Sequence, residues 1–141
     1  MKIHILTLFP EWFAGPMGES VLGRAQNAGL ASIHLHQIRN WTTDKHNTVD
    51  DTPYGGGGGM VMKAEPLAAA LDEVAGPPGS EGRARVLLTS PRGQTWDQDR
   101  AKQFAAERQD IVIICGHYEG IDERLIESRV DEEVSIGDFV L

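Results

Sequence analysis

The sequence has 141 residues, with 13 basic and 21 acidic side chains and a formal net charge of −8. Its length suits one domain, and its 40% hydrophobic and 24% charged residues exclude a disordered or fibrous protein. A single cysteine excludes an internal disulfide and favours a reducing compartment. The sequence shows neither a signal peptide nor an apolar run long enough to cross a membrane, so we expect a cytoplasmic protein.

The charge is unevenly distributed along the sequence. Residues 1–63 contain five basic and five acidic side chains, so the whole negative excess follows Lys63. A free-standing nucleic-acid-binding domain is usually basic, because neutralising phosphates supplies most of its affinity. Binding RNA would therefore require a local basic patch or a basic part outside this sequence.

The first half of the sequence predicts two strands, a helix and a long loop. Residues 3–9 form an apolar, β-branched run typical of a buried strand. Residues 11–28 carry apolar side chains at helical spacing and end at Gly29, and residues 32–38 alternate like a second strand. Residues 40–60 are rich in Thr, Asp, Asn and Gly, and predict one long loop.

Helices and strands continue to alternate in the second half. Helices are predicted over residues 65–74, 97–108 and 121–129, and strands over 86–89, 111–115 and 133–136. The apolar run at 111–115 predicts a central strand, and the alternation predicts an α/β domain with a mainly parallel sheet flanked by helices. Residues 139–141 are apolar and carry no polar tail, so we expect a fragment of a longer protein.

Three glycine-containing loops follow predicted strands, at residues 89–93, 116–120 and 135–138. Loops at the carboxyl ends of parallel strands share one edge of the sheet and form the usual ligand crevice. Glycines let the backbone approach a ligand closely, where its N–H and C=O groups can recognise a purine. None of the loops carries the dinucleotide fingerprint or the phosphate loop with its lysine. The alternative is three ordinary turns without a ligand.

Other residues that could carry chemistry are less informative. A glycine run at 55–59 is by itself typical of a flexible loop. His34 and His36 lie on one face of a predicted strand, but no third ligand stands at a diagnostic spacing, so we predict no metal site. Cys115 ends a buried strand and is expected to be an inert core thiol. Glu119 lies in a loop beside a tyrosine and is the acidic residue best placed to act.

Longer blocks of the sequence resemble the bacterial tRNA (guanine-N(1)) methyltransferase family. The two longest blocks are GHYEGIDER at 116–124 and DEEVSIGDFVL at 131–141. They are preceded, in order, by LFP at 8–10, GRA at 23–25, TVDD at 48–51, PYGGG at 53–57, and Ser-Pro at 90–91 with Gly93. The matches cover nearly the whole sequence in order, which makes them far more specific than a single glycine motif.

This resemblance implies a knotted α/β domain of the SPOUT class that works as a homodimer. It also implies transfer of a methyl group from S-adenosyl-L-methionine to ring nitrogen 1 of the guanosine 3′ of the anticodon in tRNA. The cofactor would lie in the three loops, at Leu88, Thr89, Ser90, Pro91, Gly116, Tyr118, Glu119, Gly120, Ser135, Ile136, Gly137, Asp138, Phe139, Val140 and Leu141. The tRNA would face Arg24, Asp50 and Gly59.

The family extends beyond the position of Leu141, with the rest of the cofactor site, a catalytic aspartate, its arginine partner and a helical tRNA-binding domain. We therefore expect residues 1–141 to be a cofactor-binding methyltransferase domain that is inactive alone, and we assign it no catalytic residue. Gly58 stands where some relatives have proline, and Arg92 where glutamine is frequent, a difference expected to be harmless. The alternative is a non-enzymatic α/β purine-binding or interaction module.

Overall fold

The structure is a computed structural model that describes residues 1–52, 59–137 and 139. At its centre is a five-stranded sheet in the order β2-β1-β6-β5-β7, in which every neighbouring pair runs parallel. The strands are β1 (Lys2–Thr7), β2 (Ser32–Gln37), β5 (Arg85–Thr95), β6 (Ile111–Ile114) and β7 (Glu132–Ser135). The predicted parallel α/β fold is confirmed, and β6, the strand predicted to be central, is the middle strand.

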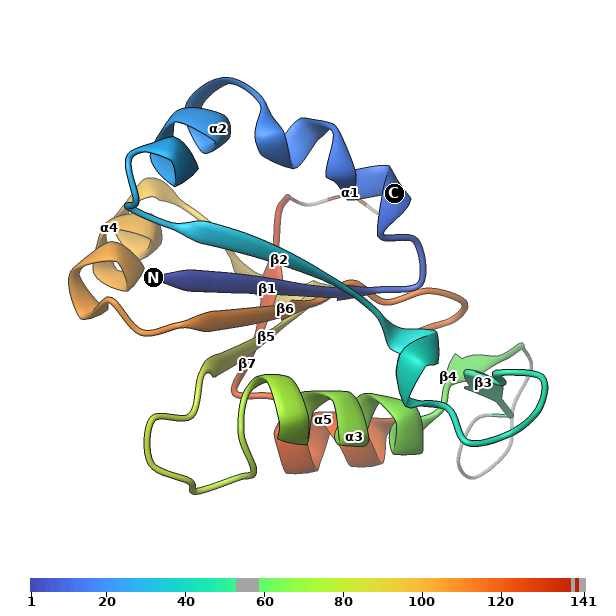
Figure 1. Cartoon of the computed structure of the whole chain (residues 1–141). Helices are drawn as coiled ribbons and strands as arrows, with labels where there is room; N and C mark the ends of the chain where they lie inside the picture. Colours follow the sequence, from blue (N-terminus) through green and yellow to red (C-terminus); the bar gives the residue numbers. More distant parts are fainter. Residues whose placement is uncertain (53–58, 138, 140–141) are drawn as a thin grey trace.

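Helices cover both faces of this sheet (Figure 1). On one face, α3 (Ala64–Val74) and α5 (Glu123–Arg129) pack on a core that includes Val86 and Val112. On the other, Phe104 of α4 (Gln98–Glu107) packs with Leu87 and Ile111. Neighbouring residues of β5 and β6 therefore pack in the cores on opposite faces of the sheet. This explains why these strands are continuous apolar runs in the sequence, since both of their faces are buried. Within the described part of the chain, no helix is long and apolar enough to cross a bilayer.

The segment predicted as one helix, residues 11–28, is interrupted. It forms α1 (Glu11–Ala14), a 3-10 turn η1 (Pro16–Gly18) and α2 (Ser20–Asn27). Pro16 has no N–H to donate to a continuing helix, so the helical ladder stops before it. Gly23 then packs directly against the carbonyl group of Gly18, a contact that any side chain at position 23 would prevent. The prediction of a continuous helix is wrong for these reasons.

The predicted long loop, residues 40–60, contains regular structure. The 3-10 turn η2 (Ile38–Trp41) extends into it, and β3 (Asp50–Asp51) pairs antiparallel with β4 (Val61–Met62). Each of these strands has two residues, too few for a periodic pattern to reveal. The predicted loop is therefore wrong at these two places, and most of the predicted glycine run, residues 55–58, lies outside the described residues.

Helix α3 agrees with the prediction within one residue and has no side-chain cap, whereas carboxylates cap the starts of α4 and α5. The Asp97 carboxylate accepts a hydrogen bond from the N–H of Arg100 at 2.9 Å and caps α4, which ends at Arg108 in the left-handed conformation (φ 55°). Asp122 caps α5 in the same way, so that helix begins at Glu123 rather than at residue 121. Side-chain caps of this kind fix a helix start within a residue or two.

Candidate cofactor-binding site

A cavity of about 290 Å³ opens where β5 and β6 approach their carboxyl ends. Two of the three predicted loops line it, together with residues from α5 and β7. The lining residues are Leu88, Thr89, Ser90, Pro91, Arg92, Gly116, Glu119, Gly120, Ile121, Glu123, Ile126 and Glu133. The predicted cofactor residues of the first two loops, apart from Tyr118, therefore share one cavity.

The first loop is a bulge inside a strand. Thr89 and Gln94 are both register partners of Val134, so residues 90–93 leave the ladder and β5 then resumes. Gly93 allows this return, because a Cβ there would lie 2.5 Å from the carbonyl carbon of Glu133 and from the nitrogen of Val134. The prediction that the strand ends at Thr89 is wrong, because no local pattern marks a strand that resumes after a bulge.

The second loop is held by the segment that follows the glycine run. The N–H of Glu119 donates to the carbonyl of Met60, and the N–H of Met62 donates to that of Gly120, both at 2.9 Å. Gly59 (φ +78°) lies directly against Glu119, since a Cβ at position 59 would be 2.5 Å from the Cγ of that side chain. No local pattern in the sequence indicates that Met60 and Met62 support this loop, since only the tertiary pairing shows their role.

The third predicted loop does not reach the described lining of this cavity, although Glu133 of β7 does. Ser135 is buried, its carbonyl accepts a hydrogen bond from the N–H of Trp96 at 2.8 Å, and its hydroxyl bonds to Gly137. Ile136 and Phe139 are exposed. The remaining predicted cofactor residues, Asp138, Val140 and Leu141, lie outside the described residues.

The residues predicted to face tRNA do not come together. Asp50 in β3 pairs with Met62 in β4. Asp50 therefore lies beside the segment, residues 59–62, that supports the second loop. Arg24 is exposed on α2, and Figure 1 shows α2 and the β3–β4 hairpin at opposite ends of the molecule. The structure thus associates Asp50 and Gly59 with the second loop but leaves Arg24 remote from it.

The charged groups of the cavity are mainly acidic. Three carboxylates, those of Glu119, Glu123 and Glu133, line it with one guanidinium, that of Arg92, so the described lining has a formal charge of −2. Next to it, the Arg124 side chain hydrogen-bonds the buried Asp122 and holds the pKa of that carboxyl below its usual range. A lining of this sign favours a ligand that carries positive charge.

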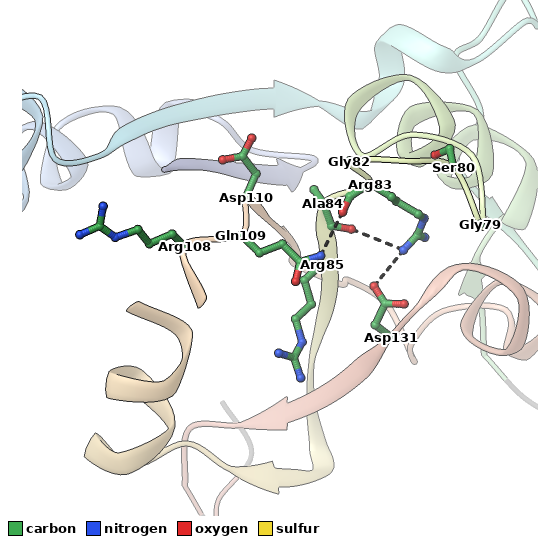
Figure 2. Close-up of a pocket in the computed structure, with 10 residues that line it drawn as sticks. All are labelled: Gly79, Ser80, Gly82, Arg83, Ala84, Arg85, Arg108, Gln109, Asp110 and Asp131. Carbon is green, nitrogen blue, oxygen red and sulfur yellow. Dashed lines mark hydrogen bonds and ion pairs between the residues drawn. The ribbon is translucent and has the colours of Figure 1, made fainter. Parts of the chain in front are cut away.

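A larger hollow, of about 810 Å³, lies at the opposite edge of the sheet, where β5, β6 and β7 begin. Figure 2 shows its three arginines, Arg83, Arg85 and Arg108, pointing away from one another. Arg83 binds Asp131 at 2.9 Å, and Arg85 binds Glu107 at 2.9 Å and Glu132 at 2.7 Å. These ion pairs hold the strand ends together, and their guanidinium groups do not converge on a ligand.

Three histidines meet on β1 and β2. His4 lies next to the predicted pair, His34 and His36. Its Nδ1 is 2.9 Å from Nε2 of His36, and its ring stacks on the ring of His34 with 5.0 Å between the ring centroids. Burial and the neighbouring rings lower the pKa of His4 and of His36. Among the residues that the structure describes, no three His, Cys, Asp or Glu side chains are arranged to hold a metal ion.

A parallel α/β sheet with a loop-lined cavity at its carboxyl edge, and without either nucleotide fingerprint, defines a small-ligand-binding α/β domain. Comparison with known proteins identifies it further. The family model described as tRNA (Guanine-1)-methyltransferase TrmD matches residues 1–141. The chain belongs to the tRNA (guanine-1)-methyltransferase family, as the sequence blocks predicted.

Curated relatives agree with the family model. The tRNA (guanine-N(1)-)-methyltransferase of Geobacter metallireducens is 57% identical over 141 residues, which cover 100% of this chain and 56% of that protein. The proteins of the same name from Chloroflexus aggregans and Heliobacterium modesticaldum are 56% and 50% identical, again over 100% of this chain and over 54% and 53% of their own length. The chain spans about half the length of the curated relatives it matches.

Proposed function

We propose that residues 1–141 form the cofactor-binding domain of a tRNA methyltransferase. This domain would take a methyl group from S-adenosyl-L-methionine and deliver it to ring nitrogen 1 of the guanosine 3′ of the anticodon. The observation that carries the proposal is the acidic cavity formed by the first two predicted loops in a chain of this family. A tRNA-binding domain would supply the excess of basic charge that this chain, with a net charge of −8, does not have.

The residues of the cavity fit the proposed cofactor. Leu88, Pro91, Ile121 and Ile126 offer apolar surface for an adenosyl group, and the excess of carboxylates suits a positively charged sulfonium. When bound, the cofactor supplies the electrophilic methyl group.

This chain's own contribution to the reaction is positional. The second loop is fixed by its hydrogen bonds to Met60 and Met62, and the first by the return of β5 at Gly93. Holding the methyl carbon and the guanine nitrogen at attack distance can supply several kcal/mol of the barrier. Guanine N1 carries a proton at neutral pH, so the transfer also needs a general base. The resemblance places that base, an aspartate, in the part of the relatives that this sequence does not match, so methyl transfer by this chain alone is expected to be absent.

Calorimetric titration tests the cofactor assignment. We expect the chain to bind S-adenosyl-L-methionine with micromolar affinity, about −8 kcal/mol, and to show no heat of binding with NAD, because the dinucleotide fingerprint is absent. Substituting the partly exposed Ser90 of the cavity lining by lysine, which places a bulky charged side chain at the site without entering the core, serves as the control for binding at this cavity. Binding of NAD in preference to the methyl donor would contradict the proposal.

We also propose that the protein is a homodimer, which the resemblance implies, and that it works in the cytoplasm, which the single cysteine supports. An apolar groove of about 800 Å³ runs past the carboxyl end of β1, and its residues Phe9 and Trp12 are exposed by 54% and 81%. Val21 and Leu22 of α2 are exposed as well. Exposed apolar surface of this kind marks association sites, and a second copy is the occupant that we propose. Light scattering at micromolar concentration should give twice the mass of one chain, and a stable monomer would contradict the dimer.

A further inference from the structure

Arg92 joins three elements at the rim of the cavity. It belongs to the bulge in β5, and its Nε lies 2.8 Å from Oε1 of Glu133 in β7. Its Nη2 lies 3.0 and 3.1 Å from the two carboxylate oxygens of Glu123, at the start of α5. These two ion pairs raise the pKa of the guanidinium further above its usual value, so Arg92 remains charged at any pH at which the protein is folded.

Strand pairing holds the residues beside Arg92 only at the two ends of the bulge. Residues 90–93 leave the β5–β7 ladder, so they lack the register that strand pairing imposes. Within the bulge, the N–H of Arg92 donates to the Ser90 hydroxyl at 3.3 Å. Ser90 and Pro91 line the cavity, and so do both carboxylates that Arg92 binds. Strand pairing and Gly93 hold the two ends of the bulge on β7, and Arg92 is the side chain that also ties the bulge to α5.

Charge gives the same contact a second effect. Glu123 and Glu133 bind one guanidinium from two sides, and without it the two carboxylates would repel each other across the cavity rim. Arg92 is 55% exposed, so the ion pairs add little to the free energy of folding. A small displacement of the rim nevertheless changes the fit of a ligand, because binding groups must be held within a fraction of an ångström.

We propose that Arg92 is a positioning residue for the cofactor, which holds the bulge at residues 90–93 against α5 and β7 and neutralises the two carboxylates at the rim. This inference rests on the proposed function, since it assumes that the cavity binds S-adenosyl-L-methionine. It replaces the expectation that Arg92 is a harmless substitution for glutamine. The neutral amide of glutamine cannot neutralise Glu123 and Glu133 or bridge them as a planar guanidinium does.

The test compares Arg92→Gln, Arg92→Lys and the unchanged chain by calorimetric titration with S-adenosyl-L-methionine. At about 0.05 M NaCl, we expect Arg92→Gln to bind about five to ten times more weakly, because displacement of the rim costs more affinity than the more acidic lining gains from the positively charged sulfonium. Arg92→Lys should recover part of the loss. At about 0.5 M NaCl, where exposed ion pairs are screened, the difference should shrink to about twofold or less. The midpoint of thermal unfolding should stay within about 2 °C, which separates positioning from a structural role.

Two further variants sharpen the test. Arg108→Gln removes the same charge at the opposite edge of the sheet, where that arginine has no ion-pair partner among the described residues, and should leave binding unchanged. Glu133→Gln should weaken binding, and combining it with Arg92→Gln should cost less than the two separate losses together, because both act through one contact. If the unchanged chain binds the cofactor and Arg92→Gln binds equally well at low salt, the inference is wrong and the proposed function stands. If the unchanged chain does not bind it, both fail.

Discussion

Replacing Gly93 by alanine is expected to destabilise the protein by about 2–3 kcal/mol and to weaken cofactor binding by more than tenfold. The added Cβ would lie 2.5 Å from the backbone of Glu133 and Val134, and 2.7 Å from the Glu133 carbonyl oxygen. Backbone atoms of a paired strand cannot move aside as a flexible side chain can. The return of β5 to the ladder would therefore open, and Ser90 and Pro91 would move with it. Chemical denaturation and calorimetric titration measure the two losses.

Gly15→Ala is the matched control for this substitution. Gly15 has an ordinary helical φ of −68°, and a Cβ there meets no atom within 4 Å. Its change should lie within about 0.5 kcal/mol of the unchanged chain, with cofactor binding unaffected. Equal stability losses at positions 15 and 93 would show that the close approach of Gly93 to β7 has no energetic consequence.

Replacing Asp122 by alanine is expected to destabilise the protein by about 1–2 kcal/mol, the usual cost of losing a helix N-cap. The buried Asp122 carboxylate accepts a hydrogen bond from the N–H of Arg124 at 2.9 Å and one from its Nε at 3.0 Å. The N–H of Asp122 also donates to the carbonyl of Met62 at 3.1 Å, which ties the start of α5 to the support of the second loop. Alanine keeps this N–H, but without the cap the start of α5 loosens. Because Ile121 and Glu123, on either side of position 122, line the cavity, cofactor binding should weaken together with stability.

The effect of this substitution should depend on pH. Since Arg124 lowers the pKa of Asp122 in the folded protein, the carboxylate stabilises the fold above its ordinary value of about 4, and that contribution is lost as the pH falls through the folded value. The stability difference between the two proteins should thus be full at neutral pH and shrink below about pH 4. Asp97→Ala removes the cap of α4 instead, and should lower stability without changing cofactor affinity. A constant difference between pH 3 and 7 would contradict the assignment.

The sequence predicted the fold better than it predicted the site. Continuous apolar runs indicated that β1 and β6 are buried strands, and the predicted helices over 97–108 and 121–129 correspond to α4 and α5 within one or two residues. Errors arose where a partner distant in sequence decides the local structure. The resumption of β5 after its bulge depends on β7, and the two-residue strand β3 exists only because β4 pairs with it.

The candidate site shows the same division more sharply. Glycine-containing loops after predicted strands located the first two loops of the cavity, and the sequence blocks indicated the family. The roles of Arg92, Met60 and Met62 could not be predicted from local patterns. Arg92 acts through contacts with residues at least 31 positions away, and Met60 and Met62 act through backbone hydrogen bonds, which form with any side chain.

The sequence by itself determined the class of fold, the positions of the central strands and the family, since these follow from local patterns of apolar, capping and glycine residues along the chain. Only the tertiary structure decided which loops share a cavity, which charges line it and what holds its rim. Those properties depend on the parallel register of β5, β6 and β7 and on close backbone approaches such as that of Gly93, which bring together segments that no local pattern connects.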